Sequence, residues 1–138
     1  MRYRYKNTLF ALASLLVGFL IYALFKPTSI IATALAKAGI LQNEALCIQI
    51  SCPFLNYYFA DFLWGFSLCC GLHTIHSPKL LGSVLCGILT TLLGICWEIL
   101  QLKQIVTGTF DIWDMLMYLS GSILCIIINL RRDNNEET

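Results

Sequence analysis

Four apolar runs separated by short polar stretches dominate the pattern of hydrophobic and polar positions along the chain. The runs cover roughly residues 8–25, 54–72, 80–100 and 113–130. A transmembrane helix needs about 20 predominantly apolar residues, so each run with its flanks is long enough to cross a bilayer. The pattern predicts an all-α membrane protein, a bundle of four transmembrane helices in one domain over residues 1–138, with a polar tail at 131–138.

A shorter segment between the first two runs predicts a fifth element. Thr28 or Ser29 can cap a helix that reaches about Ala38, and its polar positions recur at every fourth residue. This spacing is typical of a short interfacial or re-entrant helix and not of a span. Cys47 and Cys52 then flank a loop. A disulfide between them and two unpaired thiols both remain open.

The basic residues predict the orientation of the bundle. They gather in residues 2–6, before the first run, and at 131–132, directly after the last one. Because cytoplasmic flanks carry an excess of Lys and Arg, both termini are expected in the cytoplasm. His73 and His76 then fall in a solvated cytoplasmic turn. A cleaved signal peptide is the competing interpretation of the first run, but its apolar core is long for one.

Composition excludes a soluble domain. Hydrophobic residues make up 58% of the chain and charged residues 12%, whereas globular chains carry about a quarter charged residues. The net charge of +1 gives no reason to expect a nucleic-acid partner. No Cys-x-x-Cys pair or zinc-ligand spacing occurs, so neither a metal nor a cofactor is predicted. Five cysteines lie in apolar runs, where free thiols behave as small hydrophobes: Cys69, Cys70, Cys86, Cys96 and Cys125.

The acidic residues converge at one side of the predicted bundle. Asp61 lies near the outer end of the second span, Glu98 and Gln101 close the third, and Asp111 and Asp114 open the fourth. Because successive spans cross the membrane in opposite directions, all of these residues are expected at the extracytoplasmic face. Charged groups near a bilayer are costly and need a partner or a function.

Helical spacing turns these acids inward. Glu98 lies within about 40° of Gly87, Thr91 and Gly94 on a helix of about 100° per residue. Small residues mark the faces on which membrane helices pack, so Glu98 points into the bundle. Similar stripes on the other spans are Tyr58, Asp61, Gly65 and Cys69, and Asp111, Asp114, Tyr118, Gly121, Ser122, Cys125 and Asn129. The stripes predict a shared polar pocket open to the outside, for which Lys103 is the nearest cation in sequence.

Structural interpretations of the same residues stay open. Asp111 and Asp114, three positions apart, can cap the fourth helix. Gln101 and Gln104 can be hydrogen-bonding contacts between helices. The tryptophans are typical of aromatic belts at the membrane interface: Trp64, Trp97 and Trp113.

A two-part motif carries a family resemblance. It consists of Glu98-x-x-Gln101, then Thr109-Phe110-Asp111-x-x-Asp114, then Gly121. This arrangement resembles the signature of VanZ-like membrane proteins, in which a span ending in E-x-x-Q is followed by G-R-T-F-D-x-x-D-x-x-x-N-x-x-G. Asp61 is similar to an aspartate early in a preceding span of that family.

Four of the positions at which the chain departs from the family pattern bear on the candidate site. Gly108 stands in place of an arginine and Tyr118 in place of an asparagine, while Phe62 and Gly65 replace a lysine and a histidine. These departures make the chain more similar to a short VanZ-related branch of uncharacterised bacterial membrane proteins. The arginine would be a natural partner for an anionic ligand.

The resemblance implies a place in the bacterial cell membrane and a role in the cell envelope. Proteins named for VanZ are associated with low-level teicoplanin resistance, which implies an extracytoplasmic amphiphile, either a lipid-linked cell-wall precursor or a glycopeptide. Membrane lipids are expected partners, and the pattern is also compatible with an oligomer. The candidate ligand-binding residues are Asp61, Trp64, Glu98, Gln101, Thr109, Asp111, Asp114 and Tyr118.

Other functions remain as alternatives. Paired carboxylates can act as acid and base in a membrane-embedded enzyme acting on a lipid, but no nucleophile elbow, metal-ligand set or phosphate loop points to a reaction. An ion-coupled carrier is disfavoured because four spans show no internal repeat. In a purely structural or assembly protein, the acids would only lock the bundle.

Overall fold

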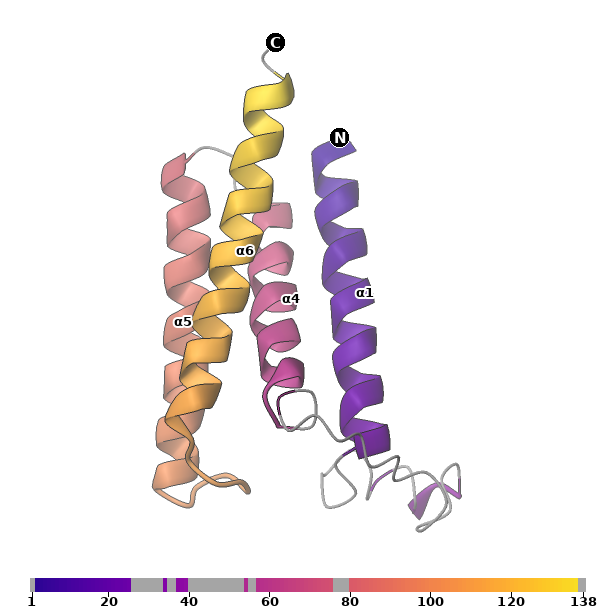
Figure 1. Ribbon diagram of the computed structural model, residues 1–138, viewed down its shortest axis with the longest axis vertical. Helices are drawn as coiled ribbons and strands as arrows, with labels where there is room; N and C mark the ends of the chain where they lie inside the picture. Colours follow the sequence, from indigo (N-terminus) through magenta and orange to yellow (C-terminus); the bar gives the residue numbers. More distant parts are fainter. Residues whose placement is uncertain are drawn as a thin grey trace.

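Four helices run side by side in alternating directions (Figure 1). The computed structural model describes residues 2–25, 34, 37–39, 54, 57–75 and 80–136, and no strand occurs among them. The helices are α1 (Arg2–Phe25), α4 (Phe59–Ile75), α5 (Leu80–Leu102) and α6 (Ile112–Glu136). The start of α1 and the end of α6 therefore lie at one end of the bundle, and the α5–α6 loop lies at the other (Figure 1).

Helix α4 is the centre of the bundle, because it packs against α1, α5 and α6. Its contact with α1 includes the rings of Phe10 and Phe66, which meet edge to face with centroids 6.4 Å apart. The Ser67 hydroxyl also donates a hydrogen bond to the Ala11 carbonyl oxygen at 2.7 Å. Helix α5 packs mainly on α6.

The distribution of side chains is inverted relative to a water-soluble bundle. Large apolar side chains cover the outside, as on α5, where Leu92 and Leu93 are each 55% exposed. Polar side chains fill the interior, including Asn7, Thr90 and Asn129, each 0% exposed. Buried polar groups and an exposed apolar surface are the informative departures from soluble folds. This distribution is the one expected of a bundle surrounded by the hydrocarbon chains of a lipid bilayer.

Among the residues that the structure describes, three helices are long and apolar enough to cross a membrane, over Arg4–Ile21, Leu80–Leu102 and Ile112–Arg131. Helix α4 is apolar but has only 17 residues, or about 26 Å at 1.5 Å per residue, against a hydrocarbon core of about 30 Å. Just before it, the Tyr58 N–H donates to the Phe54 carbonyl oxygen at 3.0 Å. A crossing by α4 stays a prediction.

The helix bounds differ from the expected spans at both ends of the chain. Helix α1 begins at Arg2, so the basic residues form its first turn instead of preceding it. Helix α6 continues to Glu136, through residues expected to form an unstructured tail. No Gly or Pro interrupts residues 131–136, and polar side chains at a helix end leave the backbone free to continue its hydrogen bonding.

The prediction that His73 lies in the turn after the second span is wrong. His73 belongs to α4 and is 0% exposed, because that helix extends to Ile75. His76 lies outside the described residues, as do Cys47 and Cys52 and most of the short helix expected near residues 28–38. Within that helix, the Ala38 N–H donates to the Ala34 oxygen at 3.0 Å.

Glycines bring the backbones of α4 and α6 into direct contact. A Cβ added to Gly65 would lie 2.8 Å from both Cα and the carbonyl oxygen of Tyr118. A Cβ added to Gly121 would lie 2.7 Å from the Phe66 nitrogen and would also overlap the Phe62 oxygen. The packing stripes expected on these helices are confirmed by the burial of Gly65, Gly121 and their neighbours.

We expect Gly65→Ala to destabilise the fold by about 1–3 kcal/mol, the usual cost of overpacking, because the atoms that the new methyl meets are backbone and cannot rotate away. The free energy of unfolding in detergent measures the effect. Gly71→Ala is the matched control on the same helix, since nothing lies within 4 Å of its added Cβ. Equal stability of the two variants would contradict the close approach.

Candidate functional site

The α5–α6 hairpin builds one wall of the candidate site, and a defined cap ends α5. The Gln104 N–H donates to the Gln101 backbone carbonyl oxygen at 2.8 Å, and the Ile105 N–H donates to the Leu100 carbonyl oxygen at 3.0 Å. Gln104 has φ of +56°. This pair of bonds around a left-handed residue is the Schellman motif, here with glutamine where glycine is usual. The chain therefore turns sharply directly after Leu102.

Helix α6 begins on a cap shared between two helices. The Asp111 carboxylate accepts the Trp113 N–H at 2.9 Å, which is the bond of an N-cap residue. In a capping box, a side chain three residues later accepts the N–H of the N-cap residue. Here Glu98, from the end of α5, accepts the Asp111 N–H at 3.1 Å. The capping interpretation of Asp111 is confirmed, and Glu98 ties the start of α6 to α5.

Gln101 makes a second tie across the hairpin. With its amide oriented to satisfy both neighbours, Nε2 donates to the Thr109 carbonyl oxygen and Oε1 accepts from Trp97 Nε1, each at 2.9 Å. The amide lies over Gly108, where an added Cβ would be 2.7 Å from the Gln101 side chain. Gly108 also has φ of +144°, which favours glycine. A side chain at position 108 would therefore strain the backbone and displace the Gln101 amide from its hydrogen bonds.

An acid cluster lies next to this hairpin, and we define it as Asp61, Glu98, Asp111 and Asp114. Asp61 is 4% exposed and Glu98 1% exposed. The Tyr118 hydroxyl donates a long hydrogen bond of 3.4 Å to Asp61. It also lies close enough to Glu98 and Asp114 to interact electrostatically with both. One acid therefore contacts the hydroxyl, and two more, from two other helices, are near enough for their charges to act on it.

The position of Tyr118 follows from the small residues around it. Its backbone lies on Gly65 of α4. Its ring lies on Gly94 of α5, where an added Cβ would be 2.6 Å from the ring carbons. A larger residue at either position would push the tyrosine out of the cluster.

The outer edge of the cluster includes Tyr58, just before α4. Partial desolvation, then the negative charges of Asp111 and Asp114, raise the pKa of its hydroxyl above the ordinary value. The sequence had indicated Tyr58 because it lies three residues before Asp61 and so on the same face of a helix. Lys103, the cation expected for the pocket, is exposed and makes no ion pair with any residue that the structure describes.

The remaining predicted site residues lie at the margin of the cluster. Trp64 faces α1, where its indole nitrogen is 3.6 Å from a Cβ placed on Gly18. The Thr109 side chain is exposed, and the contact of this residue is through its carbonyl. Trp97 and Trp113 are 46% and 55% exposed, as membrane-interface anchors would be.

A groove of about 250 Å³ lies elsewhere, between α5 and α6. Its lining includes Val84, Ile88, Ile123 and Ile126, so it is an apolar surface halfway along the helices. None of the four acids contributes to it. The groove and the acid cluster are therefore separate features.

Comparison with known proteins returns nothing: no family model, curated protein or solved structure matches the chain.

Two substitutions of Glu98 separate its hydrogen bond from its charge. Glu98→Ala removes the acceptor of the Asp111 N–H and should destabilise the protein by about 1–3 kcal/mol, the cost of a buried donor without a partner. Glu98→Gln keeps a side-chain oxygen and should cost less. Thermal unfolding in detergent measures both, with Lys103→Gln as the exposed control. If Glu98→Gln were as unstable as Glu98→Ala, the shared cap would not be what Glu98 contributes.

Proposed function

We propose that the chain is a VanZ-like multi-pass protein of the bacterial cell membrane, and that its acid cluster binds the polar head of an extracytoplasmic amphiphile. A lipid-linked cell-wall precursor or a glycopeptide such as teicoplanin is the expected kind of ligand. The observation that carries the proposal is the hydrogen bond from the Tyr118 hydroxyl to the buried Asp61, together with the charges of Glu98 and Asp114, from two further helices, that act on the same side chain.

The chemistry of the cluster selects the part of the ligand that it would contact. Ionised carboxylates only accept hydrogen bonds. The partner group must therefore be a donor, such as a sugar hydroxyl, an amide N–H or an ammonium group. A phosphate is disfavoured, since Gly108 stands where the VanZ-like signature has its arginine. Within a lipid-linked precursor, the sugar or peptide part and not the diphosphate would face these acids.

Aromatic side chains at the same end of the bundle supply an apolar rim. Phe110 is 42% exposed, beside the half-exposed Trp97 and Trp113. Aromatic rings with a polar edge favour the level of the lipid headgroups. A rim of this kind beside buried acceptors suits a ligand with both a donor-rich head and an apolar part.

The proposed orientation follows from charge. Arg4 and Lys6 lie at the end of the bundle opposite the α5–α6 loop, as does Arg131 (Figure 1). Because basic residues favour the cytoplasmic side, the acid cluster would face outward, where cell-wall precursors and glycopeptides are found.

Labelling with a membrane-impermeant maleimide in intact cells tests this orientation. In a background with Cys47→Ser and Cys52→Ser, Thr107→Cys in the α5–α6 loop should react without permeabilisation. Tyr5→Cys in α1 should react only after permeabilisation, since both positions are exposed but lie at opposite ends. The reverse pattern would place the acids in the cytoplasm and remove the proposed class of ligand.

Binding of teicoplanin and of a lipid-linked precursor to the protein in nanodiscs tests the site itself. Asp61→Asn and Glu98→Gln keep hydrogen-bond acceptors but remove charge, so we expect folded variants whose affinity falls about tenfold, equivalent to about 1.4 kcal/mol. Lys103→Gln is the control. Unchanged affinity in both variants, or none in the wild type, would leave the acids with a structural role.

A further inference from the structure

A second group of polar side chains is buried in the half of the bundle away from the acid cluster. It consists of Cys69 and His73 on α4 and Cys125 on α6, each 0% exposed. Their ligand atoms all lie within 4.8 Å of one another. No other trio of His, Cys, Asp or Glu within the described ranges meets this condition. His73 lies about 18 Å along α4 from Asp61 at 1.5 Å per residue, so the two groups are separate sites.

We propose that these three side chains bind one thiophilic divalent cation, with Zn²⁺ as the expected ion. The two ligands on α4 are four residues apart, one helical turn, and so face the same neighbour. The third comes from the helix that packs against that face. Sequence spacing did not reveal the set, because Cys125 follows His73 by 52 positions.

The distances between the ligand atoms fit a tetrahedral ion. The Sγ atoms of Cys69 and Cys125 lie 3.8 Å and 3.9 Å from His73 Nδ1. Bonds of about 2.3 Å from zinc to sulfur and about 2.0 Å to nitrogen give tetrahedral sulfur–nitrogen separations of about 3.6 Å. The two sulfur–nitrogen distances would thus need to shorten by only a few tenths of an ångström, and the two sulfurs lie no more than 4.8 Å apart.

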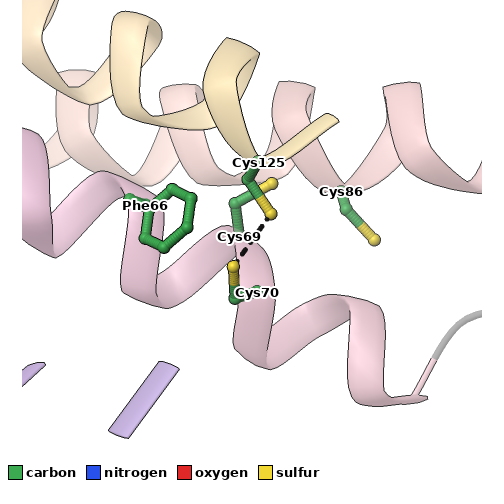
Figure 2. Packing of buried hydrophobic residues seen from close by; sticks show 5 residues of the cluster. All are labelled: Phe66, Cys69, Cys70, Cys86 and Cys125. Carbon is green, nitrogen blue, oxygen red and sulfur yellow. Dashed lines mark hydrogen bonds between the residues drawn. The ribbon is translucent and has the colours of Figure 1, made fainter. Parts of the chain in front are cut away.

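A third sulfur lies beside the trio. Cys70 Sγ lies 3.1 Å from Cys125 Sγ, and Figure 2 shows the two side chains pointing toward one another between α4 and α6. Cys70 does not belong to the group whose ligand atoms all lie within 4.8 Å of one another. The proposed site therefore has three protein ligands, and its fourth position is left for a water or another small ligand.

Charge balance favours a divalent ion at this depth. Binding to Cys69 and Cys125 would release two thiol protons, and two thiolates with a neutral imidazole cancel the charge of Zn²⁺. An isolated charge would be far more costly in this interior. The Asn129 side-chain N–H also donates toward Cys125 Sγ at 3.3 Å, as donors around metal-bound sulfur do.

The imidazole would change its proton position on binding. Nδ1 lies 2.9 Å from the Cys69 carbonyl oxygen, so in the metal-free protein Nδ1–H can donate to that oxygen. Metal binding through Nδ1 requires the tautomer with the proton on Nε2. Buried cysteines alone would be ordinary small hydrophobes. The imidazole of His73 is also fully buried, and apolar packing of two cysteines does not require a polar ring beside them.

Cobalt titration of the purified full chain in detergent tests the proposal. One Co²⁺ per chain should give a sulfur-to-cobalt charge-transfer band and tetrahedral d–d bands, and one equivalent of Zn²⁺ should remove them. Cys69→Ser and Cys125→Ser should weaken binding at least about tenfold. Cys86→Ser is the matched control, since Cys86 is 1% exposed and its sulfur points away from the other thiols in Figure 2. Cys47→Ser with Cys52→Ser, and Cys96→Ser, control for the cysteines outside the cluster.

Thermal unfolding gives a second readout. Zn²⁺ should raise the unfolding midpoint of the wild type and of Cys86→Ser, and a chelator should reverse the rise. The same rise in Cys125→Ser, or an equal loss of cobalt binding in Cys86→Ser, would overturn the site. So would the absence of the charge-transfer band in the folded wild type, whatever the variants do.

Discussion

The direct contact between the backbones of α4 and α6 is the constraint on which both buried polar groups depend. Between helices in lipid there is little hydrophobic driving force, so close packing and hydrogen bonds must hold them together. Gly65 and Gly121 allow the two helices to touch. At one end of this contact Tyr118 reaches Asp61, and at the other Cys70 meets Cys125.

The two ends of the bundle therefore have different chemistry built on one contact. Toward the α5–α6 loop the interior holds carboxylates and a hydroxyl, which are hard oxygen groups. Toward the chain termini it holds thiols and an imidazole, which are softer ligands. The hydrogen bonds of Glu98 and Gln101 to the loop backbone fix the first group, whereas the second depends only on helix packing.

Sequence periodicity predicted the part of this arrangement that depends on helical geometry. The stripes through Gly94 and Glu98, and through Gly121 and Cys125, are buried as expected, because a period of 3.6 residues decides which side faces a partner. It could not predict that Glu98 accepts a backbone N–H, since that bond depends on how the loop turns at Gln104. His73 was assigned to a turn because apolar length alone ended the second span too early.

The contact of Gly65 with Tyr118 has an evolutionary consequence. With the Tyr118 backbone 2.8 Å from a Cβ at position 65, a larger residue there cannot be accommodated while α6 stays in place. The two positions are therefore expected to be epistatic: a sequence that carries a larger residue at position 65 must also hold the axis of α6 elsewhere, so a single exchange at this position would fail where a combined one could succeed.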